Sequence, residues 1–173
     1  MTERDFEINP DDSSLIGIDK DHVAPGTGIR YKETLIEKYL TEHGNIRNLY
    51  HDVLSAYQSN NAPEFVRLLE LLHNDLRSHL LDEALNMYIY LKHYYTRDEK
   101  KLDMIQRFNR NMKKSFKQVF TFIRRFTEEG EAVRHDPRLL LQLIEMGNSL
   151  EVQFSAEERH LFCLYQRPQA TPA

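Results

Sequence analysis

Two side chains that can ligate a metal, His79 and Glu83, lie four residues apart inside a long helical pattern. They continue the three- and four-residue spacing of the apolar positions that runs from Phe65 to Leu76. Residues four apart lie on the same face of a helix. The sequence therefore predicts an imidazole and a carboxylate on a buried face. A buried ionisable group without a partner costs several kcal/mol or shifts its pKa, so both groups are expected to have partners.

The other predicted helices carry similar polar interruptions of their apolar faces, at His43, at Asn109, and at Gln153 with Glu157. Counted from the connecting turns, at about 1.5 Å per residue, these positions lie within roughly 3 to 12 Å of a common level. Imidazole and carboxylate ligands suit iron, manganese or zinc, and bundle cores hold such sites. One interpretation is therefore a metal site, whose ligands and polar completion would come from His43, His79, Glu83, Glu157, Asn109 and Gln153. The alternative is a metal-free buried hydrogen-bond network of the same residues.

Four amphipathic helices must position these groups, and they are predicted over residues 31–58, 61–95, 98–129 and 136–167. Asn61 is a favourable N-cap with Pro63 in the first turn, and Asp136 with Pro137 repeats this signal. Short connections predict an all-α, up-down-up-down antiparallel four-helix bundle over residues 31–167. Residues 1–30 are predicted to form an N-terminal arm, and residues 168–173 a short tail.

The composition is that of a soluble globular protein of one domain, with 173 residues, 40% of them hydrophobic and 29% charged. The chain has neither a long apolar run nor a secretory signal, so no membrane association is expected and the cytoplasm is the predicted location. The single cysteine, Cys163, excludes an internal disulfide and is expected to be buried and inert.

A basic stretch between Lys100 and Arg125 contains nine Lys or Arg and one Asp. Several of its side chains follow helical spacing down one outer side of the third predicted helix: Arg107, Arg110, Lys114, Lys117 and Arg124. One interpretation is a solvated face, and the other is a docking surface for an acidic protein partner. Direct nucleic-acid binding is not expected, because the whole chain carries a net charge of −4 and no DNA-reading motif.

His43, the segment from His79 to Glu83 and the segment from Gln153 to Glu158 resemble the hemerythrin-like (HHE cation-binding) family, over residues 35–165. The family's H-x-x-x-E motif on the second helix is matched by His79 and Glu83, and its first-helix histidine by His43. On the fourth helix only Glu157 matches, because Gln153 stands where the family has histidine. Asn109 is the nearest inward residue to the missing third-helix histidine.

This resemblance implies a non-haem iron site, since family members bind a di-iron centre and carry or sense oxygen, respond to nitric oxide, or store or repair iron. The two missing imidazoles belong to the second half of that site. One ion held by His43, His79, Glu83 and Glu157 is the resulting expectation, in a protein that senses or regulates. If iron is not the ion, manganese and zinc fit the same ligands.

A second resemblance is to the Rsd/AlgQ anti-sigma regulators, carried by Leu150 to Glu158 and more loosely by Leu76 to Tyr88. It implies a metal-free helical bundle that binds a protein partner, here through the basic side of the third helix. Conventional catalysis is not predicted, because no nucleophile–base pair and no Gly-rich phosphate loop are present. The oligomeric state is left open by the sequence.

Overall fold

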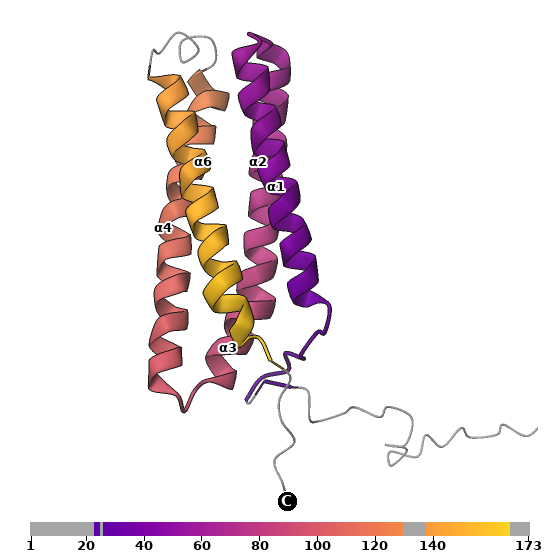
Figure 1. The fold of residues 1–173 in the computed structure, drawn as a ribbon, viewed down its shortest axis with the longest axis vertical. Helices are drawn as coiled ribbons and strands as arrows, with labels where there is room; N and C mark the ends of the chain where they lie inside the picture. The colour runs from indigo at the N-terminus through magenta and orange to yellow at the C-terminus, as the bar shows by residue number, and fades with distance from the viewer. Residues whose placement is uncertain (1–22, 25, 130–137, 167–173) are drawn as a thin grey trace, which may run out of the picture.

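The computed structural model describes residues 23–24, 26–129 and 138–166, and over these residues the chain is all-helical apart from one isolated β-bridge between Val23 and Arg30. Four helical runs lie side by side along the long axis (Figure 1). The runs consist of α1 (Leu35–Gln58), then α2 (Ala62–Glu83) with η2 (Ala84–Tyr88) and α3 (Ile89–Tyr94), then α4 (Glu99–Glu129), and last α6 (Leu139–Ala156) with η3 (Glu157–Leu161) and η4 (Phe162–Leu164). Within these residues no helix is long and apolar enough to cross a bilayer.

Local capping signals fix the turns between the helices. Asn61 accepts a hydrogen bond from the backbone N–H of Glu64 at 3.4 Å, as predicted, and Pro63 lies in the first turn of α2. Asn60 has a φ of 54°, the left-handed conformation that asparagine tolerates in a tight turn. At the next turn, the Asp98 carboxylate accepts from the N–H of Lys101 at 3.1 Å and begins α4. The predicted cap at Asp136 lies outside the described residues.

The core lies between the helices, because α1 contacts α2 and α6, and α4 contacts α2 and α6. Its fully buried members are mainly leucines and aromatic residues, and each contributes about 1.5–3 kcal/mol by leaving water. The largest of them are Tyr39, Tyr90, Phe154, Ile46, Leu69, Leu72 and Leu76. This closed packing holds each helix at a fixed rotation, so the polar residues on the inner faces are held there too.

The first helix begins at Leu35 rather than at Tyr31, the start predicted from the sequence. Residues before it are held instead by contacts from the far end of the chain. Tyr31 stacks on Tyr165 with ring centroids 5.0 Å apart, and the N–H of Lys32 donates to the Tyr165 hydroxyl at 2.9 Å. These long-range contacts favour an extended segment over another helical turn.

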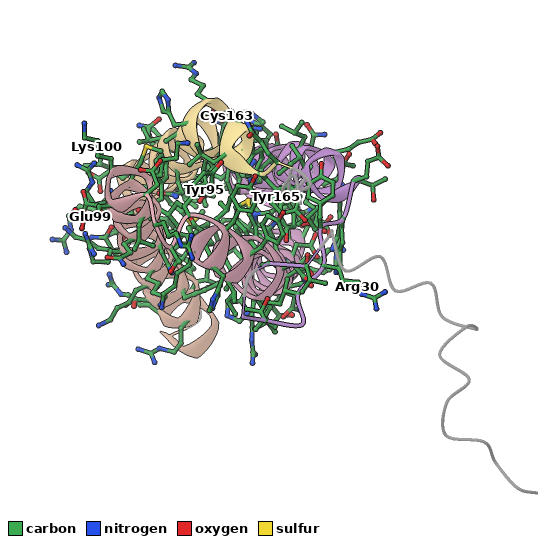
Figure 2. The ribbon with its side chains drawn as sticks, turned by 90° about the horizontal axis from the view of Figure 1, so that it is seen from below. Arg30, Tyr95, Glu99, Lys100, Cys163 and Tyr165 are labelled. Atoms are coloured by element: carbon green, nitrogen blue, oxygen red, sulfur yellow. The ribbon has the colours of Figure 1, made fainter. Side chains whose placement is uncertain are left out.

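The last helical run also departs from the predicted regular helix. It changes to a π-helix at Glu157 and to a 3₁₀ turn at Phe162, and it ends at Leu164 instead of residue 167. Cys163 is exposed, so the expected burial of this residue is wrong. In the end-on view Cys163 lies at the outer edge, whereas Tyr165 lies further inside (Figure 2). The tightened 3₁₀ turn rotates Cys163 away from the side that buries Phe162.

Two helical glycines should respond oppositely to alanine. A Cβ at Gly147 would lie 2.2 Å from the Tyr50 ring, which is held because its hydroxyl donates to the Leu143 carbonyl. We expect Gly147→Ala to destabilise the protein by about 1–3 kcal/mol through overpacking. At Gly44 a Cβ meets nothing within 4 Å, so Gly44→Ala should stabilise by about 1 kcal/mol. Urea unfolding of both variants measures the change in the free energy of unfolding. A change in the same direction for both variants would contradict the packing described.

Candidate metal centre

Three side chains that can ligate a metal meet in the core: His43 of α1, with His79 and Glu83 of α2. One ligand atom from each lies within 4.8 Å of the others, and all three residues are buried. The Nε2 atoms of the two histidines are 3.0 Å apart. Glu157, the first residue of η3, places its Oε2 3.7 Å from the His43 Nε2. The structure therefore brings together the two histidines and two glutamates singled out by helical spacing.

The outward nitrogen of each histidine contacts a carboxylate at the edge of the core. His43 Nδ1 lies 2.9 Å from Glu158 Oε1, and His79 Nδ1 lies 2.7 Å from Glu42 Oε2. Arg47 donates to the same Glu158 oxygen at 2.9 Å. Partial burial raises the pKa of Glu158, but the hydrogen bonds from Arg47 and His43 outweigh it and hold that pKa below its usual value. This carboxylate is therefore ionised at neutral pH.

These outer carboxylates determine where the histidine protons lie. Burial lowers the pKa of His43 to about 4, with help from the nearby His79, and burial also lowers the pKa of His79. Both rings are therefore neutral and carry one proton each. A carboxylate accepts only from an N–H, so each proton belongs on Nδ1. Two bare Nε2 lone pairs are left facing each other at 3.0 Å, an arrangement that a cation between them would stabilise.

The two buried glutamates are poorly satisfied by protein groups. Both carboxylate oxygens of Glu83 and the Oε2 of Glu157 are buried without a hydrogen-bond partner among the described residues. Burial, followed by the charge of Glu157, raises the pKa of Glu83 well above its usual value. Burial also raises the pKa of Glu157 to about 7, against the hydrogen bonds that it accepts from Gln153 and Tyr88. Oxygen ligands left in this state fit a divalent cation, which would compensate their desolvation.

Aromatic rings enclose the cluster and exclude water from it. Phe154 stacks on the His43 ring with centroids 3.9 Å apart, and Tyr39 meets the His79 ring edge-on at 5.5 Å. Phe162 lies on the His43 ring as well, with centroids 5.5 Å apart. In such a low-dielectric environment, both the attraction between a cation and its ligands and the penalty for an unpaired charge increase.

Both π-helical segments adjoin the candidate site. One begins directly after Glu83 and the other begins at Glu157 itself. A π segment inserts an extra residue into a helical turn and is found frequently at functional sites. Here each one changes the rotation of the chain next to a buried carboxylate. These π-helical segments were not predicted, because the apolar spacing of the sequence fits a regular α-helix.

The remaining predicted members of the site have different roles. Gln153 is buried and donates to Glu157 Oε1 at 2.6 Å, so it positions a carboxylate instead of facing the histidines. The Oδ1 of Asn109 is buried and accepts no hydrogen bond from the described residues, so Asn109 is not shown to take part in the site. Two other histidines, His51 of α1 and His160 of η3, are both exposed and lie outside the buried cluster.

The basic residues predicted to form one surface of the third helix do not all lie on the same side of α4. Lys117 and Arg124 line a groove between α2 and α4, together with Lys113, a lysine outside the predicted set. Arg110 and Lys114 are exposed and do not line that groove. Arg107 is exposed and pairs with Asp103 on its own helix at 3.2 Å.

Comparison of the chain with models of known protein families, with curated proteins and with solved structures gave no match. The interpretation of the candidate site therefore depends on its own geometry and chemistry.

Proposed function

We propose that the protein is a regulatory or sensory bundle of the hemerythrin-like kind that binds one non-haem metal ion, and that it is not an enzyme. The ligands would be His43, His79 and Glu83, with Glu157 as a second carboxylate. Iron is the ion that we favour, and manganese and zinc are alternatives suited to the same ligands. The proposal includes an up-down-up-down antiparallel order of the helices, for which the short turns at 59–61 and 95–98 are the support, and a cytoplasmic location.

The observation that supports this proposal most directly is the pair of histidine Nε2 atoms 3.0 Å apart, beside a Glu83 carboxylate with no partner among the described residues. A metal-free hydrogen-bond network would be expected to satisfy these groups, because unsatisfied members make such a network costly. The Glu158 and Glu42 contacts to the outward nitrogens also match the arrangement in which ligating histidines are oriented by carboxylates.

A regulatory role is favoured because the ligands come from three separate segments, α1, α2 and η3. Binding of an ion to all of them would stabilise one relative arrangement of these helices by linkage. Iron, when bound, would supply a reversible change of oxidation state. Loss of the bound ion would leave the Glu83 carboxylate without a partner and so destabilise that arrangement of the helices.

Metal analysis of the purified full-length chain tests the proposal. After anaerobic reconstitution with Fe²⁺, Mn²⁺ or Zn²⁺ and removal of free metal, we expect about one ion per chain for at least one of the three. Bound metal should also raise the midpoint of thermal unfolding. Fewer than about 0.2 ions per chain with all three metals would contradict a metal-binding function.

Removing the charge of one outer carboxylate should weaken metal binding without abolishing it. In Glu158→Gln the amide oxygen can still accept a hydrogen bond from His43. However, the His43 imidazole becomes a less basic metal ligand, and the ion pair between residue 158 and Arg47 is lost. We expect the affinity to fall about 10-fold, since such outer partners contribute 10- to 100-fold. Glu151→Gln is the matched control, because Glu151 is an exposed partner of Arg47. Chelator competition should show no change for the control variant.

A second candidate function is a metal-free regulator of the Rsd/AlgQ kind that binds an acidic protein partner through α4. The specific observation in its favour is the α2–α4 groove, of about 1150 Å³, where Lys113 and Lys117 accompany the exposed face of Leu81. Apolar area flanked by one sign of charge is typical of a protein-binding surface.

Charge reversal distinguishes the groove from the rest of the basic helix. We expect the double variant Lys113→Glu, Lys117→Glu to lose binding of an acidic protein partner. The double variant Arg110→Glu, Lys114→Glu should keep most of that binding. The metal content of both double variants should equal that of the wild type, so that the two candidate functions are tested separately. Equal binding by the two double variants would argue against this groove.

A further inference from the structure

The α2–α4 groove has a volume of about 1150 Å³, and it combines an apolar lining with a basic border. Its apolar lining is continuous from α2 to α4 and includes Leu80, Leu81, Ala84, Met112, Phe116 and Phe120. Leu81 is 60% exposed there and adds an accessible apolar side chain to this lining. Four basic residues border this lining: Arg77, Lys113, Lys117 and Arg124. Among the residues that line the groove, Glu70 is the one acid.

The chemistry of the groove specifies its occupant. Apolar side chains would cover the floor, and carboxylates would face the basic border. A volume of about 1150 Å³ exceeds what a small molecule needs and suits a short peptide segment. The occupant should therefore be a polypeptide that combines aliphatic or aromatic residues with a clear excess of acids.

Residues 1–22 of this chain have that composition. They contain seven Asp or Glu against one Arg and one Lys, a net charge of −5, so that the remaining 151 residues carry +1. Between the acids lie the apolar residues Phe6, Ile8, Leu15, Ile16 and Ile18. We propose that this N-terminal segment binds in the α2–α4 groove of its own chain, with Leu15 and Ile16 on the apolar floor and its carboxylates at the basic border.

The described residues that follow this segment contact η2, whose first residue, Ala84, lines the groove. Val23 pairs with Arg30, and Lys32 donates to the side chain of Asn86 at 2.8 Å. Asn86 is two residues beyond Ala84, which lines the groove. The seven residue-to-residue steps from Ile16 to Val23 can span up to about 23 Å. Along α2 the distance from Ala84 to Arg77 is about 10 Å, which is less than half of that span.

Covalent attachment favours the chain's own segment over a free peptide of the same composition. A short covalent tether gives a local concentration in the millimolar range, so weak contacts suffice for occupancy. An acidic protein partner would then have to displace the segment before binding. The segment would act as an intramolecular competitor at this surface, independently of the metal centre.

A tryptophan reporter tests the proposal in the full-length chain, which contains no natural tryptophan. In Ile16→Trp we expect blue-shifted emission and several-fold weaker quenching by acrylamide than for the same variant in denaturant. Adding Lys113→Glu and Lys117→Glu should shift the emission to the red and restore quenching. The matched pair Arg110→Glu and Lys114→Glu, on the same helix but outside the groove, should change neither. Far-UV circular dichroism checks that the helices remain folded.

Three outcomes would overturn the proposal. The first is full quenching of the tryptophan reporter in the Ile16→Trp single variant, which would leave the groove to a partner protein. The second is shielding that survives charge reversal in the groove, which would place the segment elsewhere. The third is shielding that disappears on dilution, which would assign the occupant to a second copy of the chain.

Disulfide trapping supplies a second measurement that needs no tryptophan. In a Cys163→Ser background, Ile16→Cys with Leu81→Cys should form an intrachain disulfide several-fold faster than Ile16→Cys with Leu85→Cys. Leu81 lines the groove, whereas Leu85 is similarly exposed one turn further on and does not. Equal rates for the two pairs would contradict binding in the groove.

Discussion

Replacing His79 with alanine is expected to abolish metal binding under conditions in which the wild type holds about one ion per chain. His79 supplies one of two Nε2 atoms that lie 3.0 Å apart, and no other described histidine is buried near them. Since even the partners behind ligating histidines contribute 10- to 100-fold to affinity, loss of a ligand itself should exceed about 100-fold. Competition with a chelator of known affinity measures this change.

His160→Ala is the matched control for this experiment. His160 lies beside the site in the sequence, three residues after Glu157, but its side chain is exposed. The control should bind metal as the wild type does and show the same metal-dependent rise in the unfolding midpoint. If His79→Ala and His160→Ala bind equally well, the buried cluster is not the metal site.

Helical periodicity predicted the polar residues that are buried in the core, although Asn109, which was expected among them, is only half-buried. His43, His79, Glu83 and Glu157 are all buried as expected, because an amphipathic helix has one apolar face and these positions continue it. The turn at Asn61 was equally predictable, since its cap depends only on neighbouring residues. All-helical architecture follows from the same two local signals.

The outer carboxylates could not be predicted in the same way. Glu42 and Glu158 each directly adjoin a core position in the sequence, and periodicity assigns such residues to the flank of a helix. Their contacts with the histidines depend on helix rotation and on side-chain rotamers, which are set by packing between helices. The start of α1 was mispredicted for a similar reason, because Tyr31 is held by Tyr165 from the opposite end of the chain.

Glu83→Gln is expected to have opposite effects on stability and on metal binding. In the metal-free protein Glu83 is a buried carboxyl group without a hydrogen-bond partner among the described residues, so its replacement by a neutral amide should stabilise the fold at pH 7. A buried carboxyl group with a raised pKa costs stability at neutral pH, because the unfolded chain ionises it freely and the folded chain does not, and a neutral amide avoids this cost. In a chain of this size each kcal/mol raises the unfolding midpoint by roughly 2–4 °C. Metal affinity should fall, because an amide is a weak ligand.

The effect of pH gives this prediction a specific sign. The pKa of Glu83 in the folded protein is raised above the unfolded value of 4.5, so the unfolded chain loses its proton first as the pH rises. The free energy of unfolding of the wild type therefore decreases as the pH rises above 4.5, because the unfolded chain ionises Glu83 more readily than the folded chain does. Glu83→Gln lacks this carboxyl group and does not show the decrease. The advantage of the variant in chelator should be small at pH 4.5 and largest near neutral pH.

Thermal unfolding with chelator and with saturating metal, each at pH 5 and pH 7, separates the two effects. In chelator at pH 7 the variant should unfold at a higher temperature than the wild type, and in metal this order should be reversed. Asp75→Asn, an exposed acid on the same helix, should leave the wild-type behaviour unchanged. If Glu83→Gln is instead less stable in chelator at pH 7, the carboxyl group must already have a stabilising partner in the metal-free protein. A stabilising partner would remove the reason for inferring that the carboxyl group is reserved for a cation.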